Sequence, residues 1–322
     1  MEAYIIDGVR TPIGSYQGTL SAVRPDDLGA LVIKAVTDRN PNIPKDAYDD
    51  VIMGCANQAG EDNRNVARMS LLLAGLPYTV PGETVNRLCS SGLSAIINAS
   101  RAIKAGDGHV FIAGGVENMT RGPLVVSKPS VAYGTDSKMY DSSFGWRFIN
   151  PKMHAMFGTD AMGETAENLV EKYTISREDQ DAFALNSQIK ATAAQTSGRL
   201  AKEIVAVEIP QRKGDPIQFT KDEFIKPNTS MEGLAKLRSA FKKEGSVTAG
   251  NASGLNDGAA ATIIASEEAV KRYNLKPLAR IVSSALVGVE PRIMGIGPVE
   301  ATNKALAKAG LTLNQIDIIE LN

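Results

Sequence analysis

The segment Asn86-Arg87-Leu88-Cys89-Ser90-Ser91-Gly92-Leu93 joins a short strand predicted at residues 84–86 to a helix predicted at residues 89–104. Gly106 follows that helix at a position where glycine commonly ends one. The apolar run 110–114 then predicts the next strand. Working outward, apolar runs predict further strands at 3–7, 50–54 and 259–265, and periodic patterns predict helices at 25–37 and 65–73. This alternation favours an α/β fold with a mostly parallel sheet covered on both faces.

Length and composition restrict the class of protein. A chain of 322 residues exceeds the usual size of one domain, which predicts two domains or one domain with a large insertion. Hydrophobic residues make up 43% and aromatic residues only 5%, so the core should be aliphatic. Lys and Arg number 35 against 36 for Asp and Glu, which leaves no basic field to attract nucleic acid or an anionic membrane.

The cysteine and histidine content limits the chemistry. Cys55 and Cys89 are too few for a disulfide framework and lack zinc-site spacing, so we expect a cytoplasmic protein without a metal. The chain has only two histidines, His109 and His154, which gives little basis for a Ser-His-Asp triad or a histidine-rich metal site. The sequence contains no secretory signal and no apolar run long enough to cross a membrane. We therefore expect neither secretion nor a membrane-spanning segment.

The middle of the chain differs in composition from its flanks. After about residue 121, Pro, Lys, Tyr, Ser and Met cluster, and charged amphipathic helices are predicted at 165–173 and 176–197. A helix, linker and strand order at 26–54 recurs weakly at 298–322, with further strands predicted at 279–287 and 317–321. We therefore expect an N-terminal half, an inserted domain and a partial C-terminal half, at residues 1–120 plus 246–268, 121–245 and 269–322 respectively.

Cys89 carries the chemistry that the residues themselves suggest. Free N–H groups at the start of a helix favour a thiolate, which makes a cysteine there a candidate nucleophile. The alternative is a small buried cysteine that fills a gap in the core, and this is the preferred interpretation of Cys55. The loop 247–258 combines Gly, Ser and Asn, either to let a ligand approach its backbone or simply to make a tight turn.

Four segments together, in their order and spacing, resemble the thiolase family: residues 86–92, 114–119, 247–258 and 320–322. The resemblance implies a layered αβαβα fold of two βαβαβαββ halves, the second incomplete here, with the inserted segment as the loop domain. It also implies an acyl-CoA:acetyl-CoA C-acyltransferase that cleaves 3-oxoacyl-CoA through an acyl thioester on Cys89. Coenzyme A (CoA) and acyl-CoA would be substrates, no cofactor would be bound permanently, and the protein would form a homodimer or homotetramer.

The resemblance also implies roles for individual residues. Cys89 matches the acyl-accepting nucleophile, and Asn322 matches the Asn that positions a water in a second oxyanion hole. Positions that line the family's CoA and acyl channel match Met162, Lys226, Ala249, Ser253, Leu255 and Met294.

The family's Gly-His-Pro histidine and second, acid/base cysteine have no counterpart in these 322 residues. The resemblance therefore predicts a C-terminally truncated chain that does not catalyse thiolysis by itself. A noncatalytic CoA-binding or scaffold fragment is the alternative of another class. Ketoacyl synthases share the fold, but the long insertion and the loop 247–258 speak against that enzyme class.

Segments 55–65, 145–151 and 157–160 most resemble the 3-oxoadipyl-CoA thiolases of aromatic-acid breakdown. Ala161 stands where short-chain biosynthetic thiolases carry a histidine, which weakens acetoacetyl-CoA as the substrate; acetoacetyl-CoA and medium-chain 3-ketoacyl-CoA thiolases are the alternatives. A substrate that ends in a carboxylate needs a cationic partner, and Arg64 and Arg147 are the candidates. Both arginines could instead form surface or subunit-interface ion pairs, and the loop 128–143 is a candidate subunit contact.

Overall fold

The computed structural model describes residues 1–322, and the chain divides into two compact units. Unit 1 comprises Met1–Phe144, Gln188–Pro227 and Gly254–Arg280. Unit 2 comprises Gly145–Ser187, Asn228–Ser253 and Ile281–Asn322. The domain boundaries expected from the sequence describe a different division of the chain and stay a prediction.

Unit 1 is built on a mixed seven-stranded sheet with the order β11-β1-β10-β5-β3-β4, in which β2 also pairs with β10. Its strands are β1 (Ala3–Arg10), β2 (Gly14–Ser15), β3 (Asp50–Gly54), β4 (Gly82–Val85), β5 (Val110–Asn118), β10 (Asn256–Ser266) and β11 (Ala279–Arg280). The pairs β3–β4 and β3–β5 are parallel, whereas β10 is antiparallel to β1, β2 and β5, and β11 is antiparallel to β1. The strands β1 to β5 therefore run in one direction and β10 and β11 in the other, so the sheet predicted to be mostly parallel is a mixed one in which β10 separates β1 from β5.

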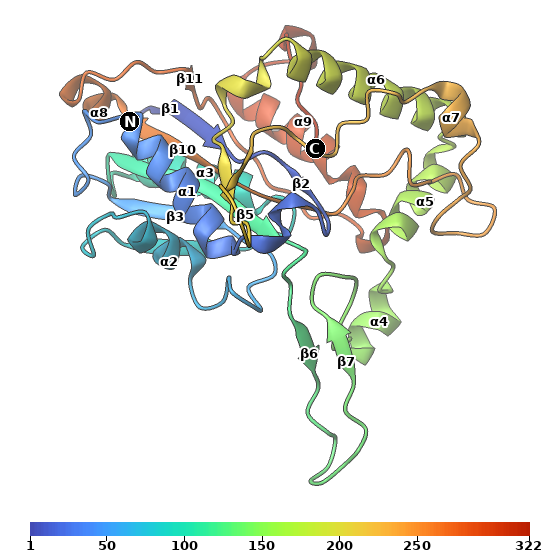
Figure 1. Cartoon of the computed structure of the whole chain (residues 1–322). Helices are drawn as coiled ribbons and strands as arrows, with labels where there is room; N and C mark the ends of the chain where they lie inside the picture. The colour runs from blue at the N-terminus through green and yellow to red at the C-terminus, as the bar shows by residue number, and fades with distance from the viewer. The chain divides into compact units, whose positions relative to one another are not determined.

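Helices cover both faces of this sheet, as the sequence predicts (Figure 1). On one face α1 (Pro25–Asp38) and α2 (Val66–Leu73) pack on an aliphatic cluster that includes Val110 and Ile112 of β5. On the other face α3 (Ser91–Ala105) packs on β5, β3 and β10. Successive residues of a strand point to opposite faces, so the apolar residues Val110–Val116 of β5 supply both layers at once.

The other elements of unit 1 are small. They are the hairpins β6 (Leu124–Val126) with β7 (Met139–Asp141) and β8 (Val207–Ile209) with β9 (Ile217–Phe219), helix α8 (Glu267–Arg272), and short three-ten helices at Thr19–Ala22 and Leu200–Lys202. The β6–β7 hairpin extends away from the sheet (Figure 1), and Leu124, Val126 and Met139 on it are exposed.

Unit 2 is helical. It contains α4 (Pro151–Phe157), α5 (Met162–Tyr173), the first part of α6 (Arg177–Thr196), α7 (Met231–Ala235), η3 (Pro291–Ile296), α9 (Gly297–Ala309) and the short η4 (Leu313–Gln315). None of the chain's helices combines the length and apolar character needed to cross a membrane.

One predicted strand forms only at its start and another does not form. Of the segment 279–287 only Ala279–Arg280 forms a strand, and the segment 317–321 forms none. Ile318 and Ile319 in the latter segment are 87% and 66% exposed. An apolar run becomes a strand only where a neighbouring strand accepts its backbone hydrogen bonds, and unit 2 provides no such neighbour.

An ion-pair cluster fastens the start of α1 to two loops of unit 1. Arg121 donates from Nε and Nη2 to the two carboxylate oxygens of Glu61, each at 2.6 Å. Arg24, the residue before α1, donates from Nη1 to Glu61 Oε1 at 3.1 Å. The hydrogen bonds from Arg121 lower the pKa of Glu61 below its usual value.

We predict that Glu61→Gln lowers the free energy of unfolding at neutral pH by about 1 kcal/mol, because a bidentate pair at a partly exposed site loses its charge. Since the folded pKa of Glu61 is lowered, its contribution is complete above the ordinary glutamate value of about 4.3 and is lost as the pH falls through the folded value. The difference in the free energy of unfolding between the wild type and Glu61→Gln should therefore be smaller at a more acidic pH than at pH 7, as measured by denaturant unfolding. Glu232→Gln, in an exposed pair on α7, is the control. A loss that is independent of pH would contradict the electrostatic explanation.

Candidate active site

Cys89 lies in the turn that leads into α3. The helix begins at Ser91 with Ser90 as its N-cap, two residues later than the sequence predicts. Cys89 is exposed, so the alternative that it is a buried core cysteine is wrong. The predicted end of the helix is confirmed, because Gly106 is its C-cap and has the left-handed φ of 89°.

Short hydrogen bonds hold this turn in an unusual conformation. Leu88 has a φ of 50°, a left-handed conformation that is unfavourable for a residue with a side chain. Its N–H donates to Asn86 Oδ1 at 2.8 Å. Ser91 Oγ accepts from the Arg87 N–H at 2.8 Å and donates to the Leu88 carbonyl at 2.6 Å. The polar side chains on either side of Cys89 thus fix the backbone that presents its thiol.

The start of α3 rests directly on the ends of β3 and β5. A Cβ atom placed on Gly54 would lie 2.3 Å from the backbone carbon of Ser91 and 2.4 Å from the nitrogen of Gly92. A Cβ on Gly115 would lie 3.0 Å from the Gly54 carbonyl oxygen. Glycine at Gly54 is therefore a steric requirement for bringing the Cys89 turn against the sheet.

We predict that Gly54→Ala lowers the free energy of unfolding by about 2 kcal/mol, because the added methyl group meets backbone atoms that have no room to move. The matched control is Gly288→Ala, since a Cβ there would meet nothing within 4 Å. Chemical denaturation of the two variants measures the difference. Equal stability of both variants would show that α3 does not depend on this contact.

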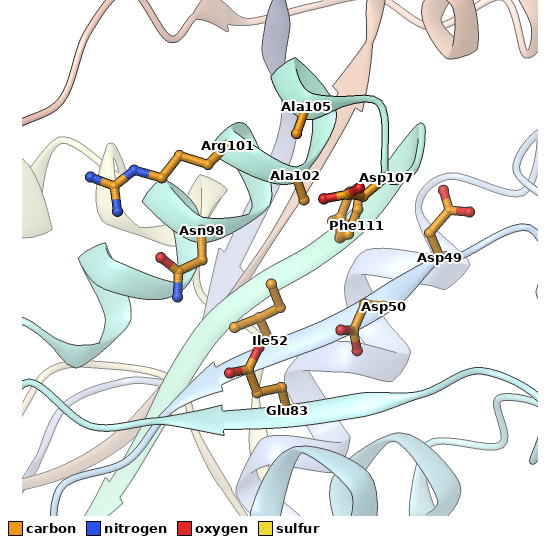
Figure 2. A pocket seen from close by; sticks show the side chains of 10 residues that line it. All are labelled: Asp49, Asp50, Ile52, Glu83, Asn98, Arg101, Ala102, Ala105, Asp107 and Phe111. Atoms are coloured by element: carbon orange, nitrogen blue, oxygen red, sulfur yellow. The ribbon is translucent and has the colours of Figure 1, made fainter.

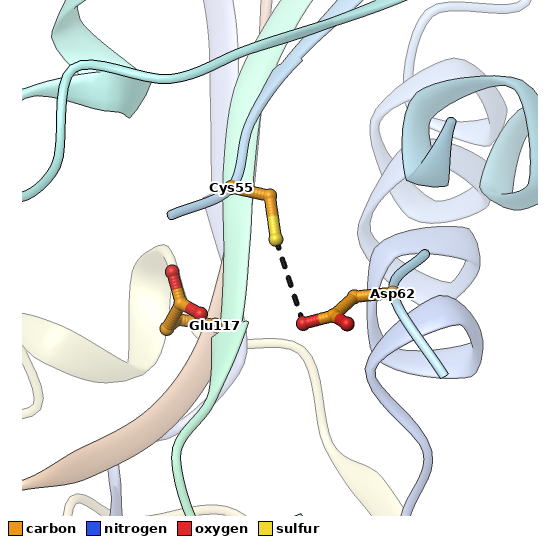
Figure 3. A group of neighbouring side chains, drawn as sticks. All are labelled: Cys55, Asp62 and Glu117. Atoms are coloured by element: carbon orange, nitrogen blue, oxygen red, sulfur yellow. Dashed lines mark hydrogen bonds between the residues drawn. The ribbon is translucent and has the colours of Figure 1, made fainter. Parts of the chain in front are cut away.

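Cys55 has the opposite environment. It follows β3 and is 1% exposed, and its thiol donates to Asp62 Oδ2 at 3.7 Å (Figure 3). Burial raises the pKa of the Cys55 thiol far above its usual value, and the charges of Glu117 and Asp62 raise it further. The prediction that Cys55 is a structural residue agrees with this burial, and its neutral thiol is a poor nucleophile.

The three side chains in Figure 3 meet closely enough to suggest a metal site. One potential ligand atom each from Cys55, Asp62 and Glu117 lies within 4.8 Å of the others. However, both carboxylate oxygens of Glu117 accept backbone N–H groups, from Ala56 at 2.8 Å and Asn57 at 3.2 Å. The cluster therefore already has partners for its carboxylate, and it shapes the loop that follows β3.

In unit 2, two buried acids shape the loop at 246–253. Glu167 of α5 is 3% exposed, and its Oε1 accepts the N–H groups of Ser246 at 2.9 Å and Val247 at 2.7 Å. Asn251 donates from Nδ2 to Asp181 Oδ1 at 2.9 Å. The loop is thus held from inside by carboxylates.

Comparison with known proteins decides the family. The model of the thiolase N-terminal domain matches residues 3–268, and that of the thiolase C-terminal domain matches residues 275–322. The chain belongs to the thiolase family. The resemblance noted in the sequence and the thiolase-like α/β fold are confirmed.

Curated and solved thiolases resemble the chain throughout. A beta-ketoadipyl-CoA thiolase of Acinetobacter baylyi is 60% identical over 320 residues, which cover 99% of this chain and 80% of that protein. The 3-oxoadipyl-CoA/3-oxo-5,6-dehydrosuberyl-CoA thiolase of Escherichia coli is 56% identical over 321 residues, or 100% of this chain and 80% of that protein. The crystal structure of a Bacillus anthracis acetyl-CoA acetyltransferase has a TM-score of 0.90 at 40% identity and covers 98% of this chain and 78% of that one.

These matches do not show that the chain is truncated or inactive, and that expectation stays a prediction. The chain is a thiolase-type acyltransferase by family. The roles expected for single residues likewise stay predictions.

The thiolase channel residues expected from the sequence lie in both units. Unit 2 holds Asn322 and, of the channel positions, Ala249 and Ser253 in the loop at 246–253, Met162 at the start of α5 and Met294 in η3, which contacts α5. Unit 1 holds Cys89, Leu255 and Lys226, whose ammonium lies 4.9 Å from the centroid of the Phe224 ring. All the channel residues are exposed, as a ligand contact requires. Their assembly around Cys89 stays a prediction.

The two arginines proposed for carboxylate recognition also lie in different units. Arg64 in unit 1 is exposed and has a left-handed φ of 65°. Arg147 in unit 2 is half-buried and follows Trp146, which donates from Nε1 to the Asp160 carbonyl at 3.2 Å. Hydrogen bonds from Asn168 and Arg292 lower the pKa of Asp160, so this part of unit 2 holds a fixed negative charge that the sequence did not reveal.

His109 is the one histidine in the same unit as Cys89, and it is not placed to activate this cysteine. His109 precedes β5, and its Nδ1 lies 3.0 Å from Ser266 Oγ. Gly114, next to the start of α3, is farther along the same strand by about 17 Å at ~3.3 Å per residue. His154 belongs to α4 of unit 2, where Nδ1 lies 2.8 Å from Thr159 Oγ1.

A cavity of about 470 Å³ opens beside the C-terminal part of α3 (Figure 2). Four carboxylates line it, from Asp49, Asp50, Glu83 and Asp107, against the single cation of Arg101. Burial raises the pKa of Asp50, and the charge of Glu83 adds to the effect. A cavity of this sign repels the phosphates of CoA, so it is not the thiolase substrate site.

Proposed function

We propose that this thiolase is an acyl-CoA:acetyl-CoA C-acyltransferase that cleaves 3-oxoadipyl-CoA through an acyl thioester on Cys89. The observation that carries the proposal is the contrast between its two cysteines, one exposed at the start of a helix and the other buried and neutral. The names of the relatives in Acinetobacter baylyi and Escherichia coli support the choice of acyl chain.

The reaction can be written around the Cys89 sulfur. The thiolate attacks the C3 carbonyl carbon of 3-oxoadipyl-CoA, a carbon–sulfur bond forms, and the C2–C3 bond breaks. The electron pair of this bond leaves with acetyl-CoA as an enolate, which takes up the proton that Cys89 lost on becoming a thiolate. The thiol of a second CoA then attacks the thioester, releases succinyl-CoA and returns a proton to Cys89. The reaction therefore converts 3-oxoadipyl-CoA and CoA to acetyl-CoA and succinyl-CoA.

Negative charge on the carbonyl oxygens is what the site must stabilise. In this proposal the N–H of Cys89 donates to the first oxyanion, and Asn322 positions a water that donates to the second. A single donor of this kind contributes about 3 kcal/mol to the stabilisation of a transition state. The turn at Leu88 supports the first assignment, because it fixes the peptide that carries this N–H.

The remaining residues would bind the substrate. The small side chains of Ala249 and Ser253 let a pantetheine arm approach the loop backbone, and Met162, Leu255 and Met294 offer exposed apolar surface to it. Lys226 is a cation for a CoA phosphate. For the subunit contacts of a homodimer or homotetramer, the exposed apolar residues on the β6–β7 hairpin support the loop 128–143 as a contact.

We predict that incubation with acetyl-CoA places one acetyl group on Cys89, detected by mass spectrometry of the intact chain and of its peptides. Cys55→Ala should still be labelled, because Cys55 is buried, whereas Cys89→Ala should not. Labelling without subsequent thiolysis would match the prediction that these 322 residues do not turn over by themselves. An acetyl group on Cys55 would remove Cys89 as the nucleophile, and binding of CoA without any labelling would favour the noncatalytic alternative.

A second prediction concerns the terminal carboxylate of the substrate. A charged hydrogen bond contributes about 1.5–3 kcal/mol, so Arg64→Ala or Arg147→Ala should raise the Kd for 3-oxoadipyl-CoA by roughly 10-fold or more, as measured by equilibrium binding. The Kd for the uncharged 3-oxohexanoyl-CoA should change by less than about 3-fold. Arg199→Ala, at an exposed residue before Leu200–Lys202, is the control. Equal changes for both substrates would assign the arginines to structure or to subunit contacts.

A further inference from the structure

We propose that Asn86 and Glu117 are positioning residues that together hold the Cys89 turn in its acyl-accepting geometry. The inference rests on Cys89 being the nucleophile, as proposed above. All of the groups involved belong to unit 1.

Asn86 connects the turn to the loop that follows β3. Its Oδ1 accepts the N–H of Leu88 at 2.8 Å, and its Nδ2 donates to the carbonyl of Ala56 at 3.0 Å. Leu88 is the residue in the left-handed conformation immediately before Cys89. One side chain thus stabilises an unfavourable backbone conformation and attaches it to the neighbouring loop.

Glu117 fixes the other side of the same peptide segment. From β5, its Oε2 accepts the N–H of Ala56 at 2.8 Å and its Oε1 accepts the N–H of Asn57 at 3.2 Å. Ala56 is therefore held through its N–H by Glu117 and through its carbonyl by Asn86. The hydrogen bonds run without a break from β5 to the residue before Cys89.

The ionised Glu117 is costly in this position. Burial raises its pKa, and the charge of nearby Asp62 raises it further, so ionisation of Glu117 reduces stability as the pH rises through its folded pKa. A charged acceptor nevertheless makes stronger hydrogen bonds to backbone N–H groups than a neutral one. Retaining a carboxylate at such a cost is typical of residues that serve function rather than stability.

In this proposal, the arrangement serves to fix the position of the Cys89 thiol and the direction of its N–H. A nucleophile misplaced by about 1 Å reduces the rate of reaction by roughly 100-fold. The Cys89 N–H must at the same time point to the oxyanion, and its direction is set by the Leu88 peptide. Loosening Asn86 or Glu117 should therefore slow acyl transfer while leaving the thiol exposed.

The test compares Asn86→Ala and Glu117→Gln with the controls Asn42→Ala, at an exposed loop residue, and Glu83→Gln, at an exposed residue of β4. For each variant, mass spectrometry gives the maximal rate of acyl-Cys89 formation and the acetyl-CoA concentration for half that rate. Alkylation of Cys89 by iodoacetamide reports exposure alone, and thermal unfolding reports folding.

We expect the maximal acylation rate to fall by about 10-fold or more in Asn86→Ala and Glu117→Gln, in line with a misplaced nucleophile. The half-saturating concentration and the alkylation rate should each change by less than about 3-fold, and Tm by no more than a few degrees. The control variants should behave as the wild type does. Unchanged acylation in both test variants would overturn the proposal, as would a loss that only parallels alkylation or unfolding.

If the wild-type chain accepts no acyl group, the proposed function fails separately. Hydrogen exchange of the Leu88 N–H then decides the positioning role. Exchange that is at least about 10-fold faster in both test variants than in the controls supports it, because protection requires the turn to stay closed. Equal exchange rates overturn it.

Discussion

The contact between the first turn of α3 and the end of β3, across Gly54, is the constraint on which the site depends. No side chain fits between Gly54 and the backbone of Ser91 and Gly92. The helix therefore begins directly against the sheet, and the residues before it are forced into a tight, exposed turn. Cys89 lies in that turn. The same steric limit thus sets both the packing of α3 on its face of the sheet and the exposure of the thiol.

Hydrogen bonds from polar groups also hold the turn before α3 in place. Leu88 adopts a left-handed conformation that its own side chain disfavours, and two hydrogen bonds stabilise it: its N–H donates to Asn86, and its carbonyl accepts from Ser91. Glu117 holds the adjoining loop through two backbone N–H groups. Cys55 lies beside the same carboxylate but is buried, and so its thiol stays protonated. The two cysteines of this unit thus differ in environment, because only Cys89 lies outside the core.

Much of the fold is predictable from local patterns. The apolar run at 50–54 and the periodic residues at 25–37 form β3 and α1 almost as predicted, because period and capping are properties of neighbouring residues. The direction of β10 was not predictable, since it depends on pairing with β1 and β5 from distant parts of the chain. The runs at 279–287 and 317–321 look like strands in sequence, but for most or all of their length no partner strand pairs with them.

In the site, too, some features are predictable from local sequence and others depend on distant parts of the chain. The position of Cys89 at the start of a helix predicts it as the nucleophile from sequence alone, and its motif indicates the family. Asn86 and Glu117 were missed, because their shared partner Ala56 is 30 and 61 residues away and only the fold brings the three together. The preference of asparagine for turns was the one local signal at Asn86.

The central claim is that the contact of α3 with Gly54 presents Cys89 as an exposed nucleophile, and a crystal structure of the chain after reaction with an acyl-CoA tests it most directly. The account predicts an acyl group on Cys89 Sγ, with its carbonyl oxygen within hydrogen-bonding distance of the Cys89 N–H, Leu88 still left-handed and α3 still starting at Ser91. An acyl group on Cys55, or a helix that begins at Cys89 with its thiol turned into the core, would contradict the account.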